Sequence, residues 1–175
     1  MSRKPVVETD RLLLREFGED DVEAYYRLGS DPEVTRYTGT GQLSSIEHAL
    51  KILRENPLTD YRRDGFGRWA CVSKANGEVI GFAGLKRLPE LGEVDIGYWL
   101  LPAYWGAGLA TEAGRAALDY GFGRLKLPRI IGLCDPANRG SIRVLEKLGM
   151  TYAETITYRG DESLKYVLDS GQQAR

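Results

Sequence analysis

The sequence is short of the residues on which several classes of protein depend. Its 175 residues include one histidine, His48, and two cysteines, Cys71 and Cys134. We therefore expect neither a disulfide scaffold nor a bound metal, and a serine–histidine triad would have no choice of base. The formal net charge is only −1, so the chain lacks the field that broad nucleic-acid binding needs.

Long apolar segments are missing too. No stretch approaches the roughly 20 apolar residues that span a bilayer, and residues 1–9 show no secretory signal pattern. Hydrophobic residues make up 42% of the chain and charged residues 28%, as in an ordinary globular protein. The length predicts one domain over residues 1–175. We expect it in the cytoplasm, where two cysteines would stay reduced.

Hydrophobic periodicity and turn residues predict grouped strands with helices inserted early and late. Helices are expected over 19–29, 44–56, 104–126 and 138–148. Strands are expected over 11–17, 68–73, 78–85, 93–101, 129–134, 151–158 and 164–168. The segment Ser44-Ser45-Ile46-Glu47 is compatible with a capping box at the second helix. This order predicts an α/β or α+β fold around a mixed sheet.

Glycine is the one residue in excess, at 21 of 175. The most informative glycines lie in residues 104–113, YWGAGLATEA, which follow an apolar strand and open a helix. Backbone N–H groups at such a turn, together with the helix dipole, form an anion site suited to phosphate. Gly106 and Gly108 would let the backbone approach that anion. The same glycines could instead serve a tight turn and close helix–sheet packing.

Two known phosphate motifs fit this turn poorly. A P-loop needs Gly-Lys-Ser/Thr, which is absent. A Rossmann fingerprint needs a third glycine, where Thr111 stands, and an acidic residue about 20 residues on, where Lys126 and Arg129 lie. Neither nucleotide-binding fold is therefore favoured.

Several motifs along the chain occur in one order. They are ETDRLLLR at 8–15, DIGYWLLP at 95–102, the glycine turn, NRGS at 138–141 and LEKLGM at 145–150. Together they resemble the GNAT acetyltransferase superfamily, above all the RimJ/RimL-like branch that acetylates the N-termini of ribosomal proteins. The resemblance covers about residues 8–168 and leaves 169–175 as a polar tail. It implies a mixed α/β (α+β) fold, with flanking helices and a central, mostly antiparallel sheet that contains two splayed parallel strands.

The resemblance implies acetyl-CoA as cosubstrate, with its pyrophosphate on the glycine turn. The family pattern is Gln/Arg-x-x-Gly-x-Gly/Ala, and Trp105 occupies its first position here, so binding would rest on backbone groups. Those groups would come from Gly106, Ala107, Gly108, Leu109, Ala110 and Thr111. The preceding strand would splay and pair its backbone with the pantetheine at Trp99, Leu100 and Leu101, as in β-strand addition. The alternative is that these three residues simply form a buried core strand.

A carboxylate near the splay is the family's usual general base. Alternation places Asp95 on the same strand face as Glu93 and Trp99, and Asp95 aligns best with that base. The alternative is a solvated surface charge. Deprotonating an α-amine at pH 7 needs only about 1 kcal/mol, against about 4–5 kcal/mol for a lysine side chain. An N-terminal acceptor would therefore demand little from a base.

Two polar residues open the predicted helix at 138–148. Asn138 is a typical N-cap, and the resemblance adds a contact with the pantetheine. In many family members a tyrosine four residues after the Ser141 position protonates the leaving thiolate, but Leu145 stands there. Ser141 is the substitute we name as acid, although it could instead bond only to the helix backbone. Cys134 closes an apolar strand and fits inert packing better than nucleophilic catalysis.

The sequence therefore predicts an N-acetyltransferase that uses direct attack in a ternary complex. Its acceptor would be a primary amine, for which a protein N-terminus and a small amine are both candidates. A non-catalytic CoA-binding sensor or interaction module on the same fold is the alternative. The predicted acceptor loops, at 35–42 and 155–162, carry no readable specificity code. A homodimer is compatible with the pattern, which does not require one.

Overall fold

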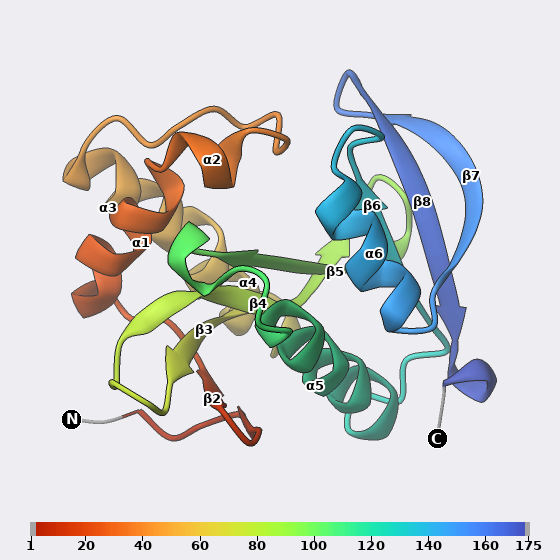
Figure 1. Ribbon diagram of the computed structural model, residues 1–175, viewed down its shortest axis with the longest axis horizontal. Helices are drawn as coiled ribbons and strands as arrows, with labels where there is room; N and C mark the ends of the chain where they lie inside the picture. The colour runs from red at the N-terminus through yellow and green to blue at the C-terminus, as the bar shows by residue number, and fades with distance from the viewer. Residues whose placement is uncertain (1–2, 174–175) are drawn as a thin grey trace.

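A computed structural model describes residues 3–173 (Figure 1). One eight-stranded sheet runs through the described residues in the order β1-β2-β3-β4-β5-β6-β8-β7, and only β5 and β6 pair in parallel. The strands are β1 (Val7–Glu8), β2 (Leu12–Arg15), β3 (Arg68–Ser73), β4 (Val79–Leu88), β5 (Glu93–Leu100), β6 (Arg129–Cys134), β7 (Thr151–Tyr158) and β8 (Asp161–Asp169). This is the mixed, mostly antiparallel sheet that the sequence predicts.

Helices cover both faces of this sheet. They are α1 (Val22–Gly29), α2 (Pro32–Thr35), α3 (Ile46–Glu55), α4 (Pro57–Asp64), α5 (Leu109–Gly123) and α6 (Arg139–Lys147), with 3-10 turns at Glu19–Asp21, Pro102–Tyr104 and Ser170–Gln172. Figure 1 shows α1, α2 and α3 gathered beside the first half of the sheet, while α6 lies beside β6 and β8. The helix α5 packs against β4 and β5.

Two apolar clusters stabilise the sheet from opposite sides. Trp69 on β3 belongs to the larger cluster under α5, and its neighbour Ala70 belongs to the smaller one under α1 and α3. Likewise Ala83 faces the larger cluster and Phe82 the smaller. Successive strand residues point to opposite faces, so this alternation shows that both faces of the sheet are buried.

The parallel strands β5 and β6 separate soon after they meet. Asp95 and Ile131 are the only residues of the two strands that stand in register, and β6 then pairs along its full length with β8. Beyond Asp95 the backbone of β5 no longer pairs with β6, and on that side the Leu100 carbonyl accepts instead from the indole N–H of Trp105 at 2.7 Å. The predicted splay is confirmed, and it opens the sheet at its centre.

Sequence periodicity located most of these elements. Strands were predicted with their observed bounds at 68–73, 129–134 and 151–158, but β1, α2 and α4 were not predicted. The sequence places Pro57 after the end of a helix, whereas in the structure Pro57 also occupies the first turn of α4, where proline is tolerated. No helix among residues 3–173 is long and apolar enough to cross a membrane.

The expected capping box at the start of α3 is wrong. The N-cap is Ser45, whose hydroxyl accepts from the backbone N–H of His48, so the third helical position holds a histidine instead of Glu47. Ser44 precedes the cap and bonds to the ring Nδ1 of His48. The helix is therefore capped once, without the reciprocal bond that a glutamate would supply.

Candidate active site

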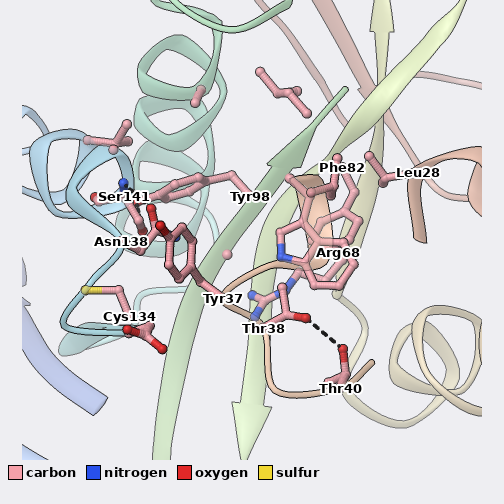
Figure 2. A pocket seen from close by; sticks show the side chains of 18 of the residues that line it. Leu28, Tyr37, Thr38, Thr40, Arg68, Phe82, Tyr98, Cys134, Asn138 and Ser141 are labelled. Carbon is pink, nitrogen blue, oxygen red and sulfur yellow. Dashed lines mark hydrogen bonds between the residues drawn. The ribbon is translucent and has the colours of Figure 1, made fainter. Parts of the chain in front are cut away.

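A cleft of about 1140 Å³ crosses the molecule where β5 and β6 diverge. Its walls come from α1, α2, α3, β5, the turn before α5, the start of α6 and the β7–β8 hairpin. Ten of the predicted site residues line it, and they are Asp95, Trp99, Leu100, Gly106, Gly108, Leu109, Ala110, Thr111, Asn138 and Ser141. Residues far apart in the sequence therefore meet at one site, part of which Figure 2 shows.

Two of the predicted residues are not among those that line the cleft. Leu101 packs against the cluster under α1 and α3. Ala107 turns its backbone carbonyl to the side chain of Arg11. Both stand beside residues that do line the cleft, so their backbone lies near it, while the side chain of Leu101 is packed elsewhere and that of Ala107 is exposed.

The turn before α5 presents backbone donors at one end of the cleft. Gly106 and Gly108 have φ of 77° and 78°, in the left-handed region that favours glycine. Gly108 is the N-cap of α5 and supplies no side-chain cap, so the first N–H groups of the helix have no intrahelical acceptor. With the positive end of the helix dipole, this turn is suited to an anion such as a pyrophosphate.

Contacts from the N-terminal segment hold this turn in place. The guanidinium of Arg11 donates to the Ala107 carbonyl at 2.8 Å and to the Glu112 carboxylate at 2.7 Å. The same carboxylate accepts from the Thr9 hydroxyl at 2.6 Å and from the Arg11 backbone N–H at 2.9 Å. Burial raises the pKa of Glu112, but these bonds outweigh it and leave the pKa lowered. We call these bonds of Thr9 and Arg11 to Ala107 and Glu112 the clamp on the turn.

A tyrosine of β5 that no sequence pattern indicated contacts the start of α6. Tyr98 on β5 donates from its hydroxyl to the Ser141 carbonyl at 3.0 Å and lies 3.1 Å from the Ser141 Oγ. Asn138 caps the helix by accepting from the Ser141 N–H at 3.1 Å, which confirms its predicted N-cap role. Figure 2 shows the three side chains together at the edge of the cleft. Burial raises the pKa of Tyr98, so its hydroxyl stays protonated.

Asp95 lies at the point where β5 and β6 separate, and it is only 7% exposed. One carboxylate oxygen forms an ion pair with Arg68 at 2.7 Å, and the other accepts from the Leu133 N–H at 3.0 Å. Arg68 also donates to the backbone carbonyl of Asp95. Burial raises the pKa of Asp95, and the charge of Arg68 opposes that rise. The side chain of Asp95 therefore connects its own strand β5 with β3 through Arg68 and with β6 through Leu133.

The opposite end of the cleft, under α1 and α2, is aromatic and apolar. The rings of Phe82 and Trp99 lie 4.9 Å apart, and Leu28 stands beside Phe82 in Figure 2. Two loops meet over this end, because a Cβ on Gly39 would stand 2.5 Å from the Asp161 carboxylate. These are the segments predicted as acceptor loops, and the structure brings them together.

Cys134 faces the cleft, but its environment does not favour a nucleophile. It is 7% exposed, and burial raises the pKa of its thiol to about 11. The thiol is therefore protonated at neutral pH, and it is the thiolate that reacts. Residues 3–173 contain no group of three or more His, Cys, Asp or Glu side chains that could hold a metal ion.

Comparison with known proteins gives this arrangement a family. Residues 11–151 match the model of an acetyltransferase (GNAT) domain. The chain belongs to the GNAT acetyltransferase family. This GNAT acetyltransferase is 35% identical over 146 residues to the uncharacterized N-acetyltransferase YoaA of Bacillus subtilis, covering 83% of this chain and 82% of the relative. It is 34% identical over 142 residues to the uncharacterized N-acetyltransferase p20 of Bacillus licheniformis, covering 80% and 79%.

Solved structures show the same fold. A GNAT-family acetyltransferase from Bacillus anthracis matches with a TM-score of 0.81 at 27% identity, covering 94% of this GNAT chain and 98% of the other. The ribosomal L7/L12 α-N-protein acetyltransferase RimL, in complex with coenzyme A, matches with a TM-score of 0.79 at 20% identity, covering 95% and 98%. The predicted fold and the predicted enzyme class, an acyltransferase, are both confirmed.

Proposed function

We propose that this acetyltransferase transfers an acetyl group from acetyl-CoA to the α-amine of a protein or peptide, by direct attack in a ternary complex. The observation that carries the proposal is the cleft itself, which crosses the sheet at the splay. One end offers backbone donors for a pyrophosphate, and the other offers an apolar and aromatic lining. A donor and an acceptor can therefore enter from different sides and meet at the centre.

We assign the donor end to acetyl-CoA. Backbone groups of residues 106–111 would bind the pyrophosphate. The edge of β5 that β6 leaves open at residues 99–101 would pair with the pantetheine, which Asn138 would also contact. The Leu100 carbonyl on this edge now accepts from the Trp105 indole N–H, so Trp105 would have to yield that bond to the pantetheine. Bound acetyl-CoA supplies the activated acyl thioester. An N–H near Leu100 would polarise the thioester carbonyl, as a donor of an oxyanion hole does.

Proton handling falls to two further residues. Ser141 would donate its hydroxyl proton to the leaving CoA thiolate and regain a proton from solvent, and its Oγ lies 3.1 Å from the Tyr98 hydroxyl. Asp95 would accept the proton of the amine through a water, because Arg68 and Leu133 already occupy both carboxylate oxygens. Its raised pKa makes it a stronger base than an exposed aspartate.

Charge at the acceptor end favours an amine with a single positive charge. The buried Asp60 carboxylate is bonded to Lys86 at 2.6 Å and to Arg63 at 3.0 Å, and Asp95 is bonded to Arg68. A polycation would have to displace these cations or bind beside them, which opposes its binding. Spermidine N(1)-acetyltransferase of Escherichia coli is a relative at 29% identity over 142 residues, but this cleft does not favour a polyamine.

An α-amine fits this charge pattern because it carries a single positive charge. It also needs little help from a general base, because it loses its proton more easily than a lysine side chain does. The deprotonation of an α-amine is about 3–4 kcal/mol less costly at pH 7 than that of a lysine side chain. Two structural neighbours, RimL and a ribosomal-protein-serine acetyltransferase from Vibrio cholerae, carry ribosomal proteins in their names. Their identity to this chain is only about 20%, so they show that the fold is shared and say nothing of its acceptor. The acceptor assignment therefore rests on the charges of the cleft.

An acceptor panel tests the proposal. Purified protein is incubated with acetyl-CoA and, in separate reactions, a peptide with a free α-amine, spermidine or kanamycin, and the release of CoA thiol is measured. We expect thiol release with the peptide to exceed release with the other two. Binding of CoA without turnover on any acceptor would instead support a sensor.

A further inference from the structure

One buried polar atom of the cleft has no hydrogen-bond partner in the part of the chain that the structure describes. Among the buried side-chain nitrogen and oxygen atoms of residues 3–173, only the hydroxyl oxygen of Tyr158 lacks a hydrogen bond. Leaving a buried hydroxyl without a hydrogen-bond partner destabilises the folded protein. Such a group persists where a ligand supplies the missing bond, and Tyr158 lines the proposed active-site cleft.

The hairpin that carries Tyr158 holds it firmly. Tyr158 is the last residue of β7 and stands opposite Asp161, the first residue of β8. The two residues between them, Arg159 and Gly160, have φ of 51° and 88°. Positive φ at both central residues is the geometry of the tight hairpin turn that matches strand twist. A non-glycine residue is held in the left-handed region there, as is common beside functional sites.

Tyr158 belongs to the acceptor side of the cleft. The last paired residues of β6 and β8 are Cys134 and Leu164, so the hairpin tip extends past the end of β6, beside the splay. Asp95 and Tyr158 line the same cavity, while the glycine turn that would hold the pyrophosphate lies at its other end. The loop that carries Gly39 meets this hairpin at Asp161.

The hydroxyl of Tyr158 is a neutral phenol at physiological pH. Burial is the main cause that raises its pKa, and the neighbouring Arg159, whose guanidinium lies over the Tyr158 ring, opposes the rise. A neutral phenol oxygen accepts hydrogen bonds and is not a proton-abstracting base. Its natural partner at this end of the cleft is an N–H donor, and the acceptor amine provides one.

We infer that the Tyr158 hydroxyl binds the acceptor amine and orients it for attack, an inference that rests on the proposed function. The oxygen accepts one N–H of the amine, while Asp95 receives the proton that leaves. No bond to Tyr158 forms or breaks. The β7–β8 hairpin thereby contributes a specific group to the acceptor site.

The variant Tyr158→Phe tests this, since it removes only the hydroxyl. We expect kcat/KM for the peptide amine to fall about 10-fold, as loss of one hydrogen bond to a polar ligand does. The KM for acetyl-CoA should not change, and Tm should stay level or rise, because no protein hydrogen bond is lost. The control is Tyr152→Phe on the same strand, whose 54% exposed side chain bonds to Thr155 at 2.8 Å. It should leave the kinetics unchanged.

Two results would contradict the inference. One is an unchanged kcat/KM for the peptide in Tyr158→Phe, and the other is a loss of activity that a drop in Tm explains. Absence of acetyl transfer by the wild-type protein would overturn the proposed function and this inference with it. Equal kinetics in wild type and variant would overturn the inference alone.

Discussion

The donor end of the cleft offers mainly backbone groups, whereas the acceptor end offers mainly side chains. At the donor end, Gly106 and Gly108 expose N–H groups, and Arg11 fixes the turn from behind. At the acceptor end, the lining residues include aromatic rings, paired charges and Tyr158. Backbone geometry constrains sequence strongly through glycine, but side-chain surfaces can vary while the fold stays the same. We therefore expect variants at the two ends to change different kinetic constants.

The largest effect should come from Ser141, which lies between the two ends. We predict that Ser141→Ala lowers kcat about 100-fold, as removal of a general acid does, and leaves both KM values nearly unchanged. Tyr98→Phe should lower kcat less, since it only orients the Ser141 hydroxyl. Steady-state kinetics at fixed pH measure both variants. An unchanged kcat in Ser141→Ala would mean that solvent, and not Ser141, protonates the leaving CoA thiolate.

A change at the donor end should affect acetyl-CoA alone. Gly108→Val places a β-branched residue at φ 78°, which costs about 1–2 kcal/mol or more and distorts the turn. We expect KM for acetyl-CoA to rise about 10-fold and KM for the peptide to stay constant. The control is Gly123→Val at the end of α5, where a Cβ meets no neighbour and φ is not positive. A rise in the peptide KM would break the separation of the two ends.

The donor end could be located from the sequence because its backbone geometry favours glycine. The left-handed turn before α5 favours glycine, so Gly106 and Gly108 located it in the sequence, and phosphate binding at this turn stays a prediction. The splay after Asp95 was predicted through the ordered motifs, and the N-cap role of Asn138 through its residue type. Side-chain partners were not: the Tyr98–Ser141 contact joins residues 43 positions apart, and the Arg11–Glu112 pair joins residues 101 apart.

The acceptor side was the part that sequence patterns described least. Periodicity over four residues cannot reveal α2, and Pro57 equally suits a helix end or a first turn. The unpaired hydroxyl of Tyr158 depends on how the β7–β8 hairpin extends past the end of β6. Contacts of this kind depend on tertiary packing, which local patterns do not encode.

The clamp on the glycine turn gives a prediction for stability. The pKa of Glu112 is lowered from 4.5 in the folded protein, so its bonds stabilise the fold above that pH and weaken as pH falls through the lowered value. Glu112→Gln should therefore be less stable than wild type by about 1 kcal/mol at neutral pH, since Arg11 is half exposed. The difference should disappear in acid. Denaturant unfolding of both proteins across pH measures it, and a difference independent of pH would contradict the prediction.

The smallest effect should come from surface charge at the acceptor end. Arg36 lines the cleft with an exposed side chain, so Arg36→Glu should help a polycation bind. We expect kcat/KM for spermidine to rise about threefold, as exposed charges contribute less than about 1 kcal/mol. Arg62→Glu, on α4 and away from the cleft lining, is the matched control. Equal effects of the two variants would mean that only net charge matters.

The most direct test of acetyl transfer to an α-amine uses two peptides of one sequence that contains a lysine, one with a free α-amine and one with it blocked. Each is incubated with acetyl-CoA and the wild-type protein, and the acetylated atom is located by mass spectrometry. We predict thiol release with the free peptide, acetylation on its α-amine, and almost no reaction with the blocked one. Equal reaction with the blocked peptide, or none with either, would contradict it.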